Sequence, residues 1–280
     1  DRAGMVDSPL LSRFDFKATA RRWDVRQGTP DALAKLDDAA RKTSVVLVQD
    51  AFTRYFETPV FAAFVELVAR LGYTVFLAPF RPNGKPLQVQ GFLDAFDGAA
   101  RRNAAMLSAL NHCGLPLIGL DPAMTLVYRQ DYRKLDGLEA IPEVLLPQEW
   151  LLRALPQTKQ ARSVPRFRLL AHCTEKTNAP AATALWAPVF ERAGLELTTQ
   201  ASGCCGMSGT YGHEARNVAT SRTIFEQSWG PILDEQQDGE MLATGYSCRS
   251  QSDRLRGRKL RHPVEALLEA MVSRGDTRTA

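Results

Sequence analysis

The stretch Gly203–Gly212, with the sequence GCCGMSGTYG, places two adjacent cysteines between glycines. Glycine lets the backbone turn sharply and approach a bound group closely. A disulfide between sequence neighbours is strained, whereas two neighbouring thiolates on such a turn suit a metal ion or an iron–sulfur cluster. The alternative is that both cysteines are small buried side chains in a tight loop. We favour metal ligands, because Cys173 and Cys248 fall in matching places.

The composition limits the partners of this site. The chain has 280 residues, of which 45% are hydrophobic and 24% charged, as expected of a globular protein with a full core. A net charge of +4 is too small to indicate nucleic-acid binding, and no apolar run is long enough for a membrane span. No signal peptide is evident, and five cysteines without a secretory context predict reduced thiols in the cytoplasm. The start, DRAGMVDSP, indicates a piece of a longer protein.

Short apolar runs alternate with helical patterns along the chain. The predicted strands are 44–49, 74–77, 115–120, 167–171, 195–199 and 240–244. The predicted helices are 59–71, 91–112, 150–155, 182–192, 213–229 and 264–272. Strands that alternate with helices in this way predict an α/β fold with parallel sheets.

The two halves of the chain repeat one another. Asp50 matches Cys173 at an offset of 123 residues (173 − 50), and Gly84 matches Gly206 at an offset of 122 (206 − 84). The nearly equal offsets predict an internal duplication, and hence two Rossmann-like sub-domains related by a pseudo-twofold axis. The expected segments are a lead-in at 1–43, a degenerate first repeat at 44–141, a connector at 142–165 and a second repeat at 166–280.

Only the second repeat carries cysteine in the three loops that follow its strands, where open α/β sheets place their sites. The predicted metal ligands are Cys173, Cys204, Cys205 and Cys248. Four thiolates can hold a 4Fe–4S cluster, which we favour, a 2Fe–2S centre, or zinc. The first repeat has other residues where a ligand set would need sulfur: Asp50, Pro82, Asn83 and Met124. At most one metal centre is therefore expected.

Residues around the cysteines are expected to support them. Gly203 and Gly206 should let backbone N–H groups reach the sulfurs. His172 is a spare ligand, a hydrogen-bond donor to sulfur, or simply a polar residue at a strand end. His213 with one of the adjacent cysteines would form a nucleophile and base, which we disfavour because no third group is evident to orient the pair.

Other features have plainer interpretations. The glycines of the cysteine loop do not follow the dinucleotide-binding spacing, so no flavin or nucleotide loop is expected. Cys113 is interpreted as a buried core thiol. The basic run Arg254–Arg261, RLRGRKLR, is interpreted as a solvated segment, with the docking of an acidic neighbouring domain as the alternative.

The cysteine pattern resembles that of the cysteine-rich CCG family, which includes a cysteine-rich component of heterodisulfide reductase and iron–sulfur components of anaerobic glycerol-3-phosphate dehydrogenase, glycolate oxidase and lactate-utilisation systems. The family motif runs Cys, Cys-Cys-Gly, Cys-x-x-Cys with long spacers. Here 30 residues separate Cys173 from Cys204 (204 − 173 − 1) and 42 separate Cys205 from Cys248 (248 − 205 − 1). Gly245 stands where the family has the first Cys of Cys-x-x-Cys, which leaves four thiolates rather than five and argues against a non-cubane cluster.

The strings HCTEKT, SGCCGMSGTYGHE and ATGYSCRSQ look most like the C-terminal domain of large fused FAD-linked oxidases, some of which are D-2-hydroxyglutarate dehydrogenases. This resemblance implies an iron–sulfur electron-transfer module of an FAD-dependent 2-hydroxy-acid dehydrogenase of D-2-hydroxyglutarate, lactate or glycolate type. FAD would then lie only in the parent enzyme, whose flavin and ferredoxin-like domains are the expected partners. No catalytic residue is expected in this chain, and any membrane association would come through a partner.

Two other functions remain open. One is a structural docking domain that retains zinc or an empty cysteine site. The other, less favoured, is a thiol-based disulfide reductase, which would show one thiol with a markedly low pKa.

Overall fold

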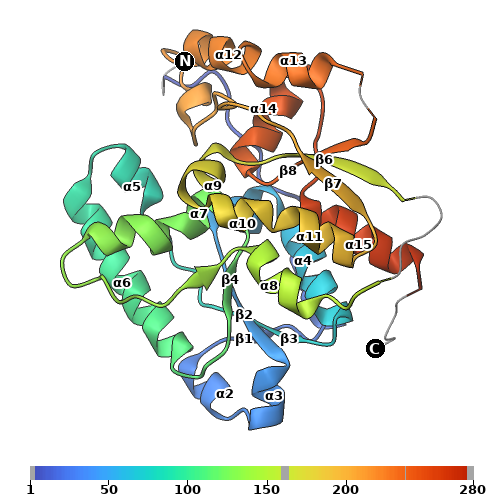
Figure 1. Ribbon diagram of the computed structural model, residues 1–280. Coiled ribbons are helices and arrows are strands. Elements are labelled where there is room, and N and C mark those ends of the chain that lie inside the picture. Colours follow the sequence, from blue (N-terminus) through green and yellow to red (C-terminus); the bar gives the residue numbers. More distant parts are fainter. Residues whose placement is uncertain (1–3, 159–163, 237, 276–280) are drawn as a thin grey trace.

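The computed structural model describes residues 4–158, 164–236 and 238–275, and within them two parallel β-sheets surrounded by helices (Figure 1). The first sheet has five strands in the order β1-β3-β2-β4-β5, and the second has three in the order β7-β6-β8. The strands are β1 (Arg26–Gln27), β2 (Ser44–Val48), β3 (Thr74–Leu77), β4 (Leu117–Gly119), β5 (Val144–Leu145), β6 (Arg166–Leu170), β7 (Glu196–Thr199) and β8 (Glu240–Ala243). The predicted α/β class with parallel sheets is confirmed.

Helices connect the strands and cover the sheets. Those up to the end of the first repeat are α1 (Phe16–Arg22), α2 (Pro30–Ala34), α3 (Asp38–Lys42), α4 (Thr58–Arg70), α5 (Lys85–Val89), α6 (Leu93–Asn111) and α7 (Pro122–Leu126). The later ones are α8 (Pro147–Ala154), α9 (Cys173–Asn178), α10 (Pro180–Ala184), α11 (Trp186–Arg192), α12 (Val218–Glu226), α13 (Trp229–Asp234), α14 (Tyr246–Arg256) and α15 (Pro263–Ser273). Shorter π- or 3-10 turns are η1 (Phe52–Phe56), η2 (Val127–Asp131), η3 (Tyr132–Lys134) and η4 (Tyr211–His213). None of the described helices has the length and apolar character to cross a membrane.

The core of the first half follows from its sequence pattern. Every residue of β2 is buried, as expected for a central strand of a parallel sheet. Helix α4 turns an apolar stripe inward at helical spacing, formed by Val60, Phe61, Phe64, Val65 and Val68.

The two halves repeat the same strand order. The arrangement β3-β2-β4 in the first sheet corresponds to β7-β6-β8 in the second, and β6 starts 122 residues after β2 (166 − 44). The matching glycines Gly84 and Gly206 have φ values of 79° and 82°, in the left-handed region that favours glycine. Strands β1 and β5, from the predicted lead-in and connector, add edges to the first sheet. Neither strand contains an apolar run long enough to be recognised from the sequence.

The two halves pack directly on one another. Helix α15 of the second half lies against α4 of the first (Figure 1). One cluster of buried hydrophobic residues takes members from both halves, among them Phe61, Phe64, Trp186 and Leu267. The duplicated units therefore form a common core.

Two predicted helices are divided or shortened in the structure. The helix expected over 182–192 is α10 followed by α11, because Pro188 in the first turn of α11 lacks the N–H that would bond to the carbonyl of Ala184. The helix expected over 213–229 is observed as α12 alone, and the separate helix α13 begins at Trp229, with Pro231 in its first turn. Helices α9 and α14 are additional, since their polar sequences give no apolar stripe.

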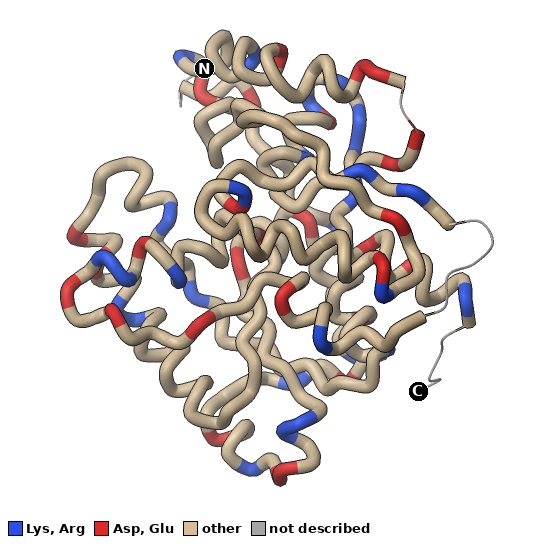
Figure 2. The backbone as a smooth tube through the Cα atoms, viewed as in Figure 1, with Lys and Arg blue, Asp and Glu red and all other residues tan. Residues whose placement is uncertain are grey.

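Charged residues of both signs are interleaved over the fold (Figure 2). The arginines of the basic run 254–261 contact acidic side chains from other elements in the ion pairs Arg254–Asp7, Arg256–Glu226, Arg256–Asp234, Arg261–Glu240 and Arg261–Glu269. Arg254, Arg256 and Arg261 are thus engaged within the chain, while Arg258 and Lys259 of the same run are exposed.

Candidate metal centre

The four cysteines of the second repeat follow three neighbouring strands. Cys173 starts α9 just after β6, Cys204 and Cys205 lie in the loop after β7, and Cys248 lies in the first turn of α14 after β8. Because β7, β6 and β8 are adjacent and parallel, their carboxyl ends meet at one edge of the sheet. The fold thereby brings together thiols that lie far apart in the sequence.

The thiols lie in a row of interacting neighbours, in which Cys204 shifts the pKa of Cys173 and of Cys205, and Cys248 also shifts that of Cys205. Cys205 and Cys248 are buried, with 2% and 1% of their surface exposed, whereas Cys173 and Cys204 are partly exposed. All are free thiols. The row therefore has one end inside the protein and one end near its surface.

Neighbouring thiols set one another's pKa. Hydrogen bonds from Cys173 and then Cys205 hold the pKa of Cys204 far below its usual range, and the N–H of Gly206 also donates to the Cys204 sulfur at 3.3 Å. Bonding to Cys204 raises the pKa of Cys173 and of Cys205, and burial adds to both rises. Without a metal, one thiolate shared among protonated neighbours is the arrangement expected.

The four cysteines have the right chemical type to bind a metal, but their side chains are not arranged around one point. Thiolates are the protein ligands of iron–sulfur clusters and of many zinc sites. Within residues 4–158, 164–236 and 238–275, however, no group of three or more His, Cys, Asp or Glu side chains is arranged to hold a metal ion. The cysteines fit a metal by chemical type, and closing the row into a ligand set would require their side chains to move.

Cys113 belongs to the first repeat and stands apart from this row. It is partly exposed, its sulfur lies 4.0 Å from the carbonyl oxygen of Pro30, and it packs against the core of that half. Its packing agrees with the predicted core role, although it is less buried than predicted.

The two glycines around the adjacent cysteines differ in what their N–H groups do. That of Gly206 reaches the Cys204 sulfur, as expected, and a Cβ at Gly206 would lie 2.2 Å from the carbonyl oxygen of Ser221. The N–H of Gly203 instead donates to Oγ of Ser228 at 2.6 Å. The expectation that both N–H groups serve the sulfurs therefore holds for Gly206 alone, because a nearby hydroxyl takes the other.

His172 is buried beside Cys173 and packs against Gly245. The ring Nδ1 of His172 accepts the N–H of Thr174 at 3.1 Å, and the backbone N–H of His172 donates to Oγ1 of Thr244 at 2.9 Å. Burial lowers the pKa of His172, which keeps the ring neutral near pH 7. A Cβ at Gly245 would lie 2.2 Å from His172 Cδ2, a contact that the sequence does not reveal.

His213, the other histidine expected near the cysteines, is engaged with the N-terminal segment. Its Nδ1 lies 2.7 Å from Oδ1 of Asp7, and Oδ2 of the same carboxylate accepts from Arg254 at 2.7 Å. Its carbonyl accepts the N–H of Val6 at 2.8 Å. In the described part of the chain no hydrogen bond joins His213 to a cysteine, so the geometry gives no support to a nucleophile–base pair.

The sequence does not identify two buried acids behind the site. Glu175, with 1% of its surface exposed, accepts hydrogen bonds from Gln148 at 2.8 Å, Trp186 at 3.2 Å and Thr244 at 2.6 Å. Burial raises the pKa of Glu175 to about 7. Asp121, from the first repeat, accepts the N–H of Tyr246 at 2.9 Å where α14 begins. Acids near helix starts usually serve as caps, so their positions carry no distinctive signal.

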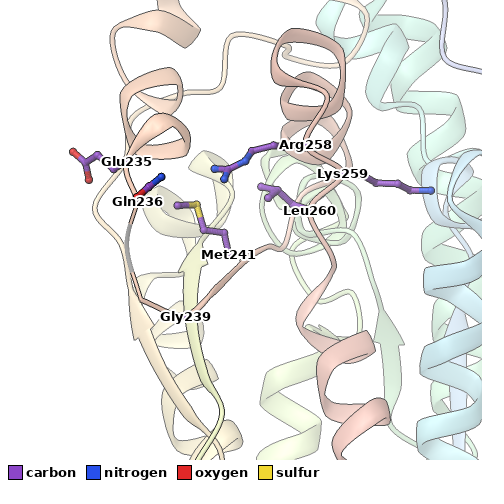
Figure 3. A pocket seen from close by; sticks show the side chains of 7 residues that line it. All are labelled: Glu235, Gln236, Gly239, Met241, Arg258, Lys259 and Leu260. Atoms are coloured by element: carbon purple, nitrogen blue, oxygen red, sulfur yellow. The ribbon is translucent and has the colours of Figure 1, made fainter.

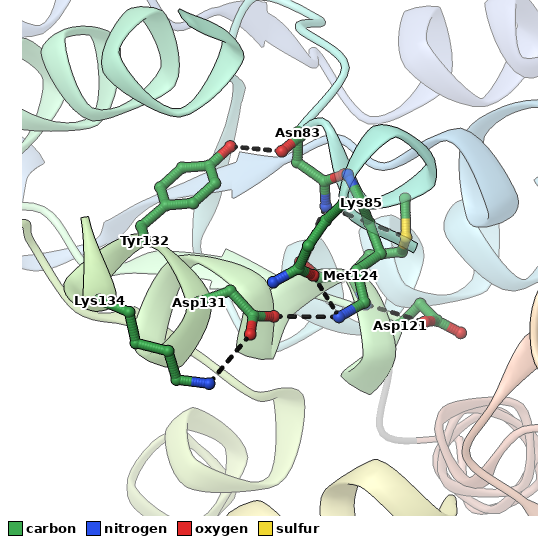
Figure 4. Close-up of polar contacts among 8 residues, drawn as sticks. Asn83, Lys85, Asp121, Met124, Asp131, Tyr132 and Lys134 are labelled. Atoms are coloured by element: carbon green, nitrogen blue, oxygen red, sulfur yellow. Dashed lines mark hydrogen bonds and ion pairs between the residues drawn. The ribbon is translucent and has the colours of Figure 1, made fainter. Parts of the chain in front are cut away.

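In the first repeat, the loop that matches the adjacent cysteines is closed by hydrogen bonds around Asn83 (Figure 4). Its Nδ2 donates to the carbonyl of Met124 at 3.0 Å, and its Oδ1 accepts the N–H of Lys85 at 3.0 Å. The hydroxyl of Tyr132 donates to the Asn83 carbonyl at 2.7 Å. Protein groups thus occupy the space where the second repeat holds thiols.

Asp50, which matches Cys173, is likewise occupied. Its carboxylate accepts the N–H of Thr53 at 2.9 Å and the hydroxyl of Thr53 at 2.5 Å. Burial, and then the charge of Asp121, raise the pKa of Asp50 to about 7. The first repeat therefore carries a buried acid at the position of a predicted ligand.

A pocket of about 590 Å³ opens elsewhere on the second repeat (Figure 3). Its lining residues come from the α13–β8 connection, β8 and the segment after α14: Glu235, Gln236, Gly239, Met241, Arg258, Lys259 and Leu260. No cysteine lines this pocket, so it is separate from the thiol row.

Comparison with known proteins shows that the sequence is similar to parts of several dehydrogenases. The chain is 64% identical over 270 residues to a D-2-hydroxyglutarate dehydrogenase of Pseudomonas putida, an alignment that covers 96% of this chain and 26% of that protein. It is 42% identical over 268 residues to the Escherichia coli K12 protein of the same name, again covering 26% of it. It is 25% identical over 270 residues to one component of the anaerobic glycerol-3-phosphate dehydrogenase of Escherichia coli K12, covering 66% of that polypeptide. No known family profile matches the chain.

The chain thus spans about a quarter of the length of the D-2-hydroxyglutarate dehydrogenases that it matches. Both kinds of relative agree with the resemblance seen in the sequence, to fused oxidases and to components of glycerol-3-phosphate dehydrogenase. The absence of a matching profile means that membership of the CCG family has no support beyond the motif itself.

Proposed function

We propose that this chain is an iron–sulfur electron-transfer module of a flavin-dependent 2-hydroxy-acid dehydrogenase, of D-2-hydroxyglutarate type. The observation that carries the proposal is the row of four thiols at the carboxyl ends of three adjacent parallel strands. The similarity to D-2-hydroxyglutarate dehydrogenases supports the substrate class. Oxidation of the substrate would take place at FAD in another part of the parent protein, beside a ferredoxin-like domain.

Cys173, Cys204, Cys205 and Cys248 would hold the cluster; four thiolates complete the ligand set of a 4Fe–4S cluster, which we favour, and also that of a 2Fe–2S centre. A bound cluster would supply one-electron transfer between the flavin and an acceptor. Within this chain, the Gly206 N–H donates to the Cys204 sulfur, and a hydrogen bond of that kind raises a cluster's reduction potential. Burial of Cys205 and Cys248 excludes water from one side of the ligand set.

Two observations favour other functions. The row of thiols is not arranged as a ready ligand set, which favours a docking domain that keeps zinc or nothing at the site. The pKa of Cys204 is markedly low, the property expected of a disulfide reductase. Its cause is bonding to neighbouring thiols rather than a nearby cation, and any metal-free cluster of thiols has that property. We therefore keep electron transfer as the leading function.

The deciding experiment is anaerobic purification followed by iron, acid-labile sulfide and zinc analysis, with visible absorption spectra. Wild type should hold iron and sulfide in equal amounts. Cys205→Ser should lose essentially all of both, because each of four ligands is required, whereas Cys113→Ser should keep them. A folded wild-type chain with zinc, or with no metal after reconstitution, would reject electron transfer in favour of the docking function. Full iron in Cys205→Ser would remove Cys205 from the ligand set.

A further inference from the structure

The ring of His172 lies between the two loops that carry Cys173 and Cys248. A Cβ built on Gly245 would stand 2.2 Å from His172 Cδ2 and 2.8 Å from Cγ, well inside any allowed contact. The backbone of Gly245 has φ −90° and ψ 135°, which every residue type adopts readily. Glycine is therefore needed at 245 because the imidazole occupies the space of a side chain, and not because of backbone conformation.

Hydrogen bonds on several sides hold His172 in this position. Its Nδ1 caps α9 by accepting the N–H of Thr174, and its backbone N–H donates to Oγ1 of Thr244. The Thr244 hydroxyl gives its own hydrogen to Glu175 at 2.6 Å, which leaves a lone pair for His172. The ring orientation is also fixed, since exchanging Nδ1 with Cδ2 would place a carbon against the Thr174 N–H.

These bonds select one tautomer of the ring. A neutral imidazole has one N–H and one lone pair, and here the lone pair of Nδ1 is used by Thr174. The proton of the neutral ring is therefore on Nε2. A histidine that binds a metal through Nε2 must offer a lone pair there, which this tautomer does not have.

We propose that His172 is not a metal ligand but a positioning residue: it presents an Nε2–H donor at the thiol site and fills the volume that a side chain at residue 245 would need. His172 directly precedes Cys173, and its ring lies against Gly245, three residues before Cys248. The part of the inference that concerns a metal rests on the proposed function, whereas the tautomer and the contact with Gly245 do not.

The inference changes what is expected of a fifth thiol. The backbone of Gly245 would accept a cysteine, because its φ of −90° is allowed for every residue type. The imidazole nevertheless blocks the Cβ, so a cysteine at 245 would join the other four only if His172 were also made small.

Two His172 variants each retain the hydrogen-bonding function of one ring nitrogen, and neither should change metal binding if His172 is not a ligand. Asparagine retains an acceptor near the place of Nδ1 and is a good helix cap, whereas glutamine retains a donor near the place of Nε2. Titration of the reduced, metal-free chain with cobalt(II) should give the same stoichiometry and the same four-sulfur spectrum for wild type, His172→Asn and His172→Gln. Loss of cobalt, or a nitrogen-ligand signature in wild type that both variants lack, would overturn the proposal.

The space shared by residues 172 and 245 can be tested without any metal. Gly245→Ala should lower the melting temperature by several degrees, and His172→Ala combined with Gly245→Ala should melt above Gly245→Ala alone. Gly98→Ala is the matched control, because its Cβ would meet only Arg102 Nη1 at 3.4 Å. A Gly245→Ala chain as stable as wild type, or a double variant that melts lower still, would contradict the shared volume.

The tautomer has its own direct measurement. The ¹⁵N chemical shifts of the metal-free chain labelled at histidine should show an unprotonated Nδ1 and a protonated Nε2 for the resonance that disappears in His172→Asn. The opposite pattern would overturn the donor role. If wild type binds no metal while this pattern and the size exchange are found, the proposed function fails and the assignment of the ring stands.

Discussion

The first and second repeats set their loops on the same arrangement of three parallel strands but fill those loops with different chemistry. The strand order β3-β2-β4 recurs as β7-β6-β8, and Gly84 and Gly206 share a left-handed backbone. At these turns the second repeat places free thiols, whereas the first places Asn83 in bonds to its own backbone. The loop geometry therefore does not depend on sulfur, and hydrogen bonds within the protein can maintain it.

The comparison also shows that the two repeats depend on one another. Asp121 of the first repeat accepts the Tyr246 N–H at the start of the helix that carries Cys248. Arg249, one residue beyond Cys248, is 2% exposed and forms an ion pair with Glu57 of the first repeat. The first repeat thus holds in place the helix that carries Cys248.

The largest effect is expected from breaking the ion pair between the repeats. Glu57→Ala would leave the buried Arg249 guanidinium without its anion, which should lower the free energy of unfolding by about 3–5 kcal/mol. Urea unfolding measures this change. Glu226→Ala, which removes a carboxylate from a more exposed pair within the second repeat, should change the stability far less. Equal losses in the two variants would mean that the interface pair has no special weight.

The second effect concerns the acid that stands in the place of Cys173. The folded-state pKa of Asp50 is raised, so the folded chain binds more protons than the unfolded chain between pH 4 and about 7. The contribution of Asp50 to stability is therefore greatest at the acid end of this range and falls as pH rises through it. Asp50→Asn should remove on the order of 2 kcal/mol of that fall, since Asp121 shares the interaction.

Unfolding midpoints in urea at pH 4.5 and pH 7.5 would detect this difference. The exposed Asp136→Asn is the control and should leave the pH dependence as in wild type. A steeper dependence in Asp50→Asn would show that the buried carboxylate stabilises the first repeat when charged.

The smallest effect is expected at Asn83. Asn83→Ala removes its side-chain bonds to Met124 and Lys85, and should cost about 1–2 kcal/mol, because the two backbone groups lose a buried partner. The metal content should not change, since the thiols lie in the other repeat. Asn217→Ala, which removes a bond at a partly exposed position, is the matched control. A loss of metal in Asn83→Ala would show that the first-repeat loop supports the thiol site.

Much of this arrangement could be predicted from the sequence. The strands β2, β3 and β4 are short apolar runs, and the nearly equal offsets from Asp50 to Cys173 and from Gly84 to Gly206 predict the duplication without any structure. Because parallel strands end at one edge, the same spacing also predicts that the four cysteines are neighbours. The assignment of these cysteines as ligands, and the proposed domain boundaries, remain predictions.

Other parts could not be predicted, because they depend on contacts between distant residues. The sequence does not show that the His172 ring contacts Gly245. It also does not show that the Gly203 N–H donates to Ser228 rather than to a sulfur. Edge strands β1 and β5 are two residues long and carry no periodicity. Glu175 resembles an ordinary residue in the first turn of a helix until three donors from separate elements surround it.

The uneven burial of the thiols gives the site a direction. If the chain transfers electrons as proposed, a redox partner would approach the side where Cys173 and Cys204 reach the surface, because electron tunnelling weakens steeply with distance. On the other side, Cys205 and Cys248 belong to a buried apolar cluster with Phe225 and Trp229, which separates their sulfurs from solvent. Oxidants and chelators face the same restriction as partners, so damage should begin at Cys204 and Cys173 and reach the inner pair last. An electron-transfer centre that is exposed on one side only would exchange electrons at that surface and would not conduct them from one side of the protein to the other.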